Sequence, residues 1–157
     1  LIVKKLFGTV TGKKISILGF AFKANTNDTR ESAAIIICKD LIEEGALLSI
    51  HDPKVDINQI EKDLGIKSIL TADKRLEDES VKNKGGWTYA TSINASLMRA
   101  DASIVITEWE DYENIDWQMA KKIMRSPSWI FDARSILNTK KVKDAGLNLW
   151  RIGDGSY

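Results

Sequence analysis

The feature that most constrains the fold is a regular alternation of short apolar runs with helical segments. The first run, Lys14–Gly19, reads as a strand that ends in glycine, and after a polar loop the apolar stretch Ala33–Ile42 reads as a helix. Gly45 stops that helix, and Leu47–His51 is a second strand. Strand, helix and strand in this order form a β-α-β unit, whose strands lie parallel because the helix supplies the crossover.

The same alternation continues to the end of the chain and indicates an α/β fold. Further strands are expected at Trp87–Thr91, Ala102–Thr107, Trp129–Asp132 and Leu147–Ile152, and further helices at Asn58–Leu64, Ile93–Arg99, Lys140–Ala145 and along the apolar face Tyr112, Ile115, Met119 and Ile123. We therefore predict a three-layer sandwich, in which helices cover both faces of a mostly parallel sheet of five or six strands.

The length of 157 residues suits one domain, which we assign to residues 13–157. Residues 1–12 are expected to be the end of an upstream helix and a connector, because the chain starts at Leu1 and its first apolar residues recur at helical intervals. Residues 73–86 carry four acidic and four basic side chains and little to bury, which predicts an exposed charged insertion within the domain.

Composition excludes several classes of function. The 23 basic and 22 acidic residues leave a net charge of +1, so no overall attraction to nucleic acid or to an anionic membrane is expected. The single cysteine, Cys38, cannot form an internal disulfide, and nothing resembles a signal peptide or membrane span, which predicts a cytoplasmic protein.

Cys38 lies in an apolar stretch and is expected to be a buried, unreactive thiol. His51 is the only histidine, so we expect a core or turn role for it and no metal site.

The loop between the first strand and the first helix carries two cations at the sheet edge where open α/β folds bind ligands. Lys23 follows the strand end, where its ammonium can reach a phosphate, although an ordinary surface lysine fits equally well. Arg30 is expected in the first helical turn, where the helix dipole disfavours a cation by roughly 0.3–1 kcal/mol. A functional contact and a solvated arginine both remain open for it. Asp28 and Glu31 predict a capping box at the helix start.

A third cation, Arg134, follows the fifth strand at the same edge. Its guanidinium can bind a phosphate or a carbonyl through two N–H groups, and the alternative is an ion pair with Asp132 that only closes a turn. Together Lys23, Arg30 and Arg134 predict an anion-binding crevice. The segment Thr107–Trp109 lies at the corresponding position after the fourth strand, and its indole is expected to cover the core.

One absence limits cofactor binding. After Gly19 the next glycine is Gly45, so the loop lacks the Gly-x-Gly-x-x-Gly pattern that holds a dinucleotide pyrophosphate. This domain is therefore not expected to hold NAD by itself.

Three segments of the chain resemble a known family. They are Gly19–Lys23 continuing into Asp28–Ser32, then Thr107–Trp109, and then Phe131–Arg134. In this order they resemble the carboxyl-terminal domain of the UDP-glucose/GDP-mannose dehydrogenase family, and the resemblance covers nearly the whole chain. The first segment looks closer to the members that act on UDP-glucose than to those that act on GDP-mannose or UDP-N-acetylmannosamine.

The resemblance implies a Rossmann-like, UDP-binding domain of an NAD-dependent enzyme, which oxidises the C6 hydroxyl of UDP-glucose to a carboxylate through a thiohemiacetal on a cysteine. Amino-terminal and central regions, missing here, would hold NAD and supply that cysteine, so this chain alone is expected to be inactive. By the matched motifs, Phe22, Lys23 and Arg134 contact the UDP-sugar, and Arg30 contacts NAD. The family often has glycine where this chain has Ala133. Its members are commonly dimers or hexamers, so a homo-oligomer is expected. A non-catalytic nucleotide-binding module is the alternative from another class.

Overall fold

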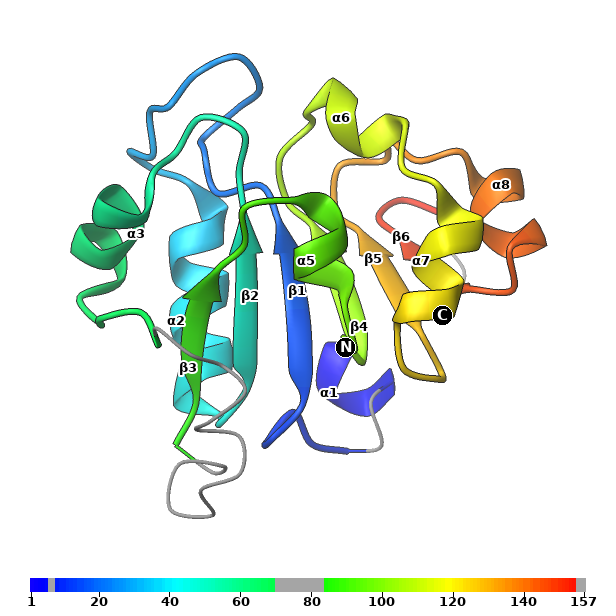
Figure 1. Cartoon of the computed structure of the whole chain (residues 1–157), viewed down its shortest axis with the longest axis horizontal. Coiled ribbons are helices and arrows are strands. Elements are labelled where there is room, and N and C mark those ends of the chain that lie inside the picture. Colours follow the sequence, from blue (N-terminus) through cyan, green and yellow to red (C-terminus); the bar gives the residue numbers. More distant parts are fainter. Residues whose placement is uncertain (6–7, 70–83, 155–157) are drawn as a thin grey trace.

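The sheet is parallel throughout. The computed structural model describes residues 1–5, 8–69 and 84–154, and these form six strands in the order β3-β2-β1-β4-β5-β6, with every neighbouring pair parallel (Figure 1). The strands are β1 (Lys14–Leu18), β2 (Leu47–His51), β3 (Gly86–Tyr89), β4 (Ala102–Val105), β5 (Trp129–Asp132) and β6 (Asn148–Arg151). This is the strand order of the dinucleotide-binding Rossmann fold, so the predicted Rossmann-like α/β sandwich is confirmed.

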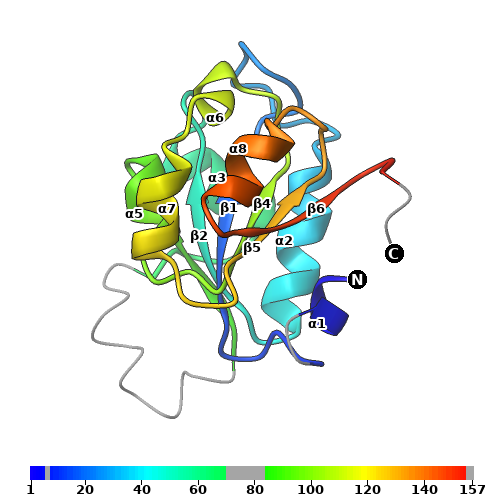
Figure 2. The ribbon, with the colours of Figure 1, turned by 90° about the vertical axis from the view of Figure 1, so that its right-hand side faces the viewer.

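Helices cover both faces of this sheet. On one face lies α2 (Ala33–Glu43), and on the opposite face lie α5 (Ile93–Leu97) and α7 (Trp117–Ile123) (Figure 2). Next to α2 packs α3 (Ile57–Leu64), and against β6 packs α8 (Thr139–Asp144). Two single-turn helices are α1 (Ile2–Lys5) and α6 (Glu110–Glu113). Within the described ranges, no helix has the length and apolar character needed to cross a membrane.

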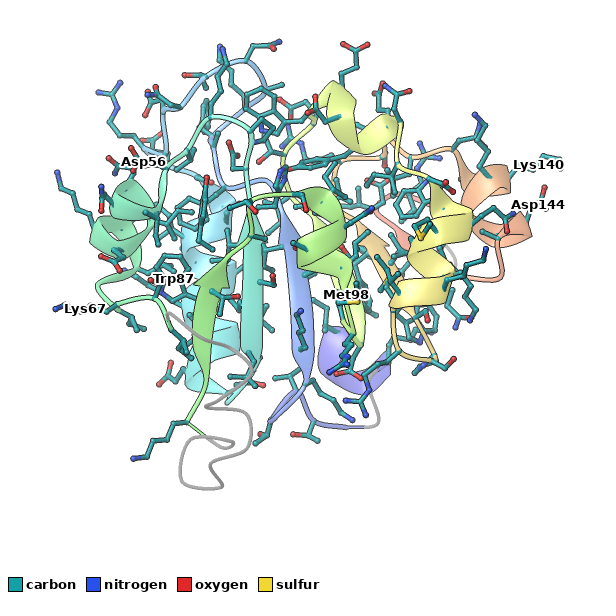
Figure 3. All side chains as sticks on the ribbon, in the orientation of Figure 1. Asp56, Lys67, Trp87, Met98, Lys140 and Asp144 are labelled. Carbon is teal, nitrogen blue, oxygen red and sulfur yellow. The ribbon has the colours of Figure 1, made fainter. Side chains whose placement is uncertain are left out.

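Burial on both faces explains the apolar strand sequences. In β1, Ile15, Ile17 and Leu18 are fully buried, and every residue of β2 and β4 is buried as well. A strand that is covered on both sides has no solvent-facing positions, so it reads as a continuous apolar run. At the sheet edge, Trp87 of β3 is fully buried, and its indole N–H donates to the carbonyl of Ile66 at 2.8 Å (Figure 3). This contact fastens the edge strand to the segment after α3.

The predicted single helix with Tyr112 and Met119 on one apolar face was wrong. Two short helices, α6 and α7, occupy this region. The second one starts at Asp116, whose side chain accepts a hydrogen bond from the backbone N–H of Met119 at 3.0 Å. This N-cap begins a new helix in a new phase, so Trp117 and Ala120 face the core while Met119 stays 40% exposed.

Two predictions fall partly outside the described residues. Leu6 and Phe7 of the predicted upstream helix lie there, and so do residues 73–83 of the predicted charged insertion. The last residue of the predicted insertion, Gly86, belongs to β3. The division into a connector and a domain at residue 13 stays a prediction.

Candidate functional site

The candidate site lies at the carboxyl ends of β1, β4 and β5. Open α/β sheets bind ligands where the strand order reverses, which here is between β1 and β4. These strand ends point upward in Figure 1, with α6 at the same edge. Since Lys23 and Arg30 follow β1 and Arg134 follows β5, the parallel sheet brings all three predicted cations to one edge.

A buried carboxylate, Asp52, holds the start of the β1–α2 loop. It lies just after β2 and is 3% exposed. Its two oxygens accept hydrogen bonds at 2.8–3.2 Å from the backbone N–H groups of Phe20, Ala21, Lys54 and Val55 and from the indole N–H of Trp109. One side chain therefore fixes the segments that follow β1, β2 and β4. The sequence analysis missed this role, because Asp52-Pro53 reads as an ordinary turn.

Gly19 lets the loop leave β1 in close contact with β4. Its φ is +100°, and a Cβ atom at this position would lie 2.4 Å from the Cβ of Thr107. The Thr107 hydroxyl in turn donates to the carbonyl of Ala21 at 2.9 Å. Any larger residue than glycine would push the two loops apart.

The middle of the β1–α2 loop, between Phe22 and Asp28, folds back on itself. The backbone N–H of Phe22 donates to the carbonyl of Asp28 at 2.7 Å, so the chain returns to its starting point. Its tip, Asn25–Asn27, lines an open polar hollow of about 390 Å³ together with Lys54. Phe22 itself is 48% exposed, so an aromatic ring lies open to solvent directly beside Lys23.

The predicted capping box at the start of α2 was wrong. The N-cap is Ser32, whose hydroxyl accepts from the N–H of Ala34 at 3.2 Å and donates to the carbonyl of Phe20 at 2.8 Å. Glu31 has a positive φ of 61°, which turns the chain before the helix begins. The helix therefore starts at Ala33, as the apolar stretch predicted, and after both residues of the predicted capping box, so Asp28 is free to bind another group.

That group is Arg30. Its Nε donates to Asp28 Oδ1 at 3.0 Å and its Nη2 to Asp28 Oδ2 at 2.8 Å, so the pair is bidentate. This hydrogen bonding to Arg30 lowers the pKa of Asp28 to about 2. Because Arg30 precedes the N-cap, it lies outside the helix, and the predicted conflict with the helix dipole was wrong. The side chain is 88% exposed, as expected for a solvated arginine, and it also has a local partner.

Arg134 does not form the alternative ion pair with Asp132. The contact between Arg134 and Asp132 is made by the backbone N–H of Arg134, which donates to the carboxylate at 3.2 Å, while the guanidinium of Arg134 forms an ion pair with Glu108. The other oxygen of Glu108 accepts the N–H of Ala24 at 3.0 Å. We call Lys23, Glu108 and Arg134 the edge cluster. The sequence analysis placed Glu108 at this edge but gave it no role.

Charge in the edge cluster is unevenly compensated. Burial raises the pKa of Glu108, but hydrogen bonds from backbone N–H groups, including that of Ala24, and the charge of Arg134 outweigh it and lower the pKa overall. Lys23 is exposed and has no ion-pair partner within residues 1–5, 8–69 and 84–154. The cluster therefore offers one uncompensated ammonium and one guanidinium whose ion pair is made through Nη2.

The loop that carries Arg134 is supported by β6. Asp132 is fully buried and accepts the N–H of Leu137 at 2.9 Å, while Arg151 lies 3.8 Å from the same carboxylate. The guanidinium of Arg151 also donates to the carbonyl of Ser135 at 2.6 Å. This network holds the backbone of Arg134 and leaves its side chain 44% exposed.

Three other predictions concern side chains away from the edge cluster. Cys38 is fully buried, as predicted, and this burial raises the pKa of its thiol. His51 is 8% exposed, and its Nδ1 lies 2.9 Å from the hydroxyl of Tyr112, in agreement with a core role. Trp109 is buried and covers the core as predicted. The described part of the chain contains no cluster of three or more side chains suited to hold a metal ion.

The loop after β1 does not fit an NAD pyrophosphate. In a Rossmann domain the backbone N–H groups of this loop bind the pyrophosphate. Here the N–H groups of Phe20 and Ala21 are already taken by Asp52 at 2.8 and 2.9 Å, and Ser32 caps α2. The residues present therefore do not form a cradle for NAD, which agrees with the missing glycine pattern.

Comparison with known proteins decides the family. Residues 16–139 match the family model described as UDP-glucose/GDP-mannose dehydrogenase family, UDP binding domain. The chain belongs to this dehydrogenase family. Among curated relatives, UDP-glucose 6-dehydrogenase of Drosophila melanogaster is 40% identical over 156 residues, covering 97% of this chain and 30% of that protein. UDP-glucose 6-dehydrogenase of Caenorhabditis elegans is 40% identical over 152 residues, with the same coverage. The chain thus spans about 30% of the length of these relatives.

Solved structures of the family share the fold. A UDP-glucose dehydrogenase from Pyrobaculum islandicum matches with a TM-score of 0.60 and 26% identity over 95% of this chain and 27% of that one. A UDP-D-ManNAc dehydrogenase from Pyrococcus horikoshii matches with a TM-score of 0.69 and 22% identity, over 99% of this chain and 29% of that one. The second likeness shows the fold alone.

Proposed function

We propose that this chain is the UDP-sugar-binding part of a UDP-glucose 6-dehydrogenase, an NAD-dependent enzyme that oxidises UDP-glucose to UDP-glucuronate with two NAD. Family membership and 40% identity to two enzymes of that name support the substrate. The observation that carries the proposal is the edge cluster, in which the loop of Lys23 and the guanidinium of Arg134 meet on one carboxylate. A cluster of this kind suits a ligand with a diphosphate and hydrogen-bonding rings.

Each residue has a role that its chemistry supports. Lys23 binds the diphosphate, because its uncompensated ammonium can approach phosphate oxygens as a point charge. Arg134 donates hydrogen bonds to the nucleotide-sugar through the guanidinium edge that Glu108 does not use. Phe22 gives apolar contact to a ring of the ligand, since its aromatic face is open to solvent at the same place.

The chemistry of oxidation belongs to other parts of the enzyme. Arg30 is exposed and, within the described residues, pairs with Asp28 of its own loop; it contacts NAD held by the amino-terminal region. That region and a central one supply the nucleophile. The one cysteine of this chain, Cys38, is fully buried and therefore cannot reach a ligand. The complete enzyme is a cytoplasmic homo-oligomer, and the present chain alone turns nothing over.

Titration calorimetry of the 157-residue chain tests the binding role. UDP and UDP-glucose are expected to bind, and GDP-mannose is expected to bind more weakly. Preference for GDP-mannose or UDP-N-acetylmannosamine would assign the chain to another dehydrogenase of the family. Absence of binding to any nucleotide-sugar would contradict the proposed site. An NADH absorbance assay on the same sample should stay at background, and measurable NADH formation would overturn the division of labour.

A further inference from the structure

Glu108 joins two loops that leave the sheet at different strands. Its Oε1 accepts the backbone N–H of Ala24 at 3.0 Å, and its Oε2 forms the ion pair with Arg134. The side chain is 30% exposed, and its lowered pKa keeps it ionised at neutral pH. Because Ala24 directly follows Lys23, this one carboxylate ties the backbone of the Lys23 loop to the guanidinium of Arg134.

A carboxylate in this place carries a cost for an anion site. The negative charge of Glu108 repels a diphosphate, so Glu108 must favour ligand binding in some other way if the edge cluster is an anion site. Arg134 has several torsions and is 44% exposed, and without a partner its guanidinium would sample many rotamers. A ligand would then have to order the side chain on binding, which reduces affinity. The ion pair with Glu108 orders the guanidinium in advance through Nη2 and leaves the other N–H donors available.

We propose that Glu108 is a positioning residue for the nucleotide-sugar: it fixes the guanidinium of Arg134 and the loop of Lys23 in their binding arrangement before the ligand arrives. This inference rests on the proposed function, because it concerns the same edge cluster. Glu108 itself does not bind the ligand, and its effect passes through Arg134.

The opposite role for Glu108, a competitor that occupies Arg134 until an anion displaces it, fits the geometry less well. A competitor should be held by Arg134 alone, so that it can swing away. Glu108 is also held by Ala24, on a loop that Asp52 fixes from the other side through Ala21. Displacement would break both contacts of the carboxylate. The two roles predict opposite effects of neutralising Glu108, so one series of variants separates them.

The test is a double-mutant cycle with UDP as the titrant in calorimetry, using the 157-residue chain. Its four proteins are the parent, Glu108→Gln, Arg134→Ala and the double variant. Glu108→Gln keeps the size of the side chain and removes the ion pair, and it should bind UDP about five- to tenfold more weakly than the parent. In the Arg134→Ala background the same change should alter the Kd by less than about twofold, because its target is gone.

The matched control is Glu110→Gln. Glu110 lies two residues further on, in the first turn of α6, and is exposed, so the variant removes the same charge near the edge without touching Arg134. It should bind UDP as tightly as the parent or slightly more tightly, by relief of repulsion. Comparing Glu108→Gln with Glu110→Gln thus separates the positioning of Arg134 from the overall charge at this edge.

A second variant covers the case in which Glu108→Gln does not fold. Glu108→Asp keeps the charge but is one methylene shorter, so it cannot span Ala24 and Arg134, and it should lose the same affinity. Unchanged or tighter UDP binding by the Glu108 variants would overturn the positioning role, and so would an equal loss with and without Arg134. If the parent does not bind UDP, both the proposed function and this inference are wrong. If the parent binds UDP and the Glu108 variants bind it equally well, only the role of Glu108 is wrong.

Discussion

Two arginines at the same sheet edge show different kinds of pairing. Arg134 reaches from the loop after β5 to Glu108 after β4, and that carboxylate also holds the loop after β1. Arg30 pairs with Asp28 two residues away in its own loop and is 88% exposed. The first pair depends on the tertiary fold and fixes the distance between two loops. The second is satisfied locally and imposes nothing on the rest of the molecule.

The difference between the two pairs indicates which arginine is better suited to a ligand site. A local pair such as Asp28 and Arg30 would form in many contexts, and exposed pairs contribute little to stability. A pair that links separate strands, such as Glu108 and Arg134, needs the sheet in place first. This difference supports the proposal that the edge cluster binds the nucleotide-sugar and that Arg30 contacts a group outside the described residues.

The largest expected effect comes from Asp52, the buried carboxylate that fixes the loops next to the edge cluster. Asp52→Ala leaves several buried N–H donors without a partner and should lower the free energy of unfolding by about 3–5 kcal/mol. Urea denaturation measures it. The control is Asp56→Ala, which removes the N-cap of α3 and should cost only about 1 kcal/mol. Equal losses in the two variants would show that Asp52 is an ordinary turn residue.

The second effect concerns Arg30 in the complete enzyme. Arg30→Ala should raise the KM for NAD by about five- to tenfold and leave the KM for UDP-glucose unchanged, because it removes a charge-assisted contact to the cofactor alone. Steady-state kinetics with each substrate varied separately will show this. Arg125→Ala is the matched control, since Arg125 is exposed before β5, at the opposite edge. An unchanged KM for NAD would return Arg30 to a surface arginine.

A smaller effect is expected from pH. Burial lowers the pKa of His51, against the partly opposing charges of Asp52 and Asp111, so the folded chain binds a proton less readily than the unfolded chain, whose histidine has a pKa near 6.5. Stability from this residue is complete above pH 6.5 and declines as the pH falls from there through the folded pKa. Urea denaturation between about pH 7.5 and 5.5 should show the decline in the parent. In His51→Asn it should be absent, and an equal slope in both proteins would assign it to other groups.

The sequence was sufficient to predict the fold and to predict which edge of the sheet carries Lys23 and Arg134. Parallel strands place all their carboxyl ends together, so Lys23 and Arg134 could be assigned to one edge from their positions after the first and fifth strands. The family resemblance rested on the same loops. What joins these residues, Glu108 and Asp52, could not be predicted, because hydrogen bonds across loops depend on the packing of three strands.

Local patterns failed where tertiary contacts competed with them. Asp28 and Glu31 have the spacing of a capping box, but Ser32 also bonds to the carbonyl of Phe20 after β1 and becomes the N-cap instead. Asp116 similarly interrupts an apolar spacing that suited one long helix. In both places a polar side chain that accepts a backbone N–H decided where the helix began.

Calorimetry with UDP-glucose on two variants of the 157-residue chain, Arg134→Ala and Arg30→Ala, tests the central claim most directly. Each change removes one guanidinium from the same sheet edge, but only Arg134 belongs to the edge cluster. Arg134→Ala should weaken binding by about tenfold or more, allowing for the partial exposure of the side chain, and Arg30→Ala should stay within about twofold of the parent. Unchanged binding by Arg134→Ala, or an equal loss in both variants, would contradict the claim that the edge cluster binds the nucleotide-sugar.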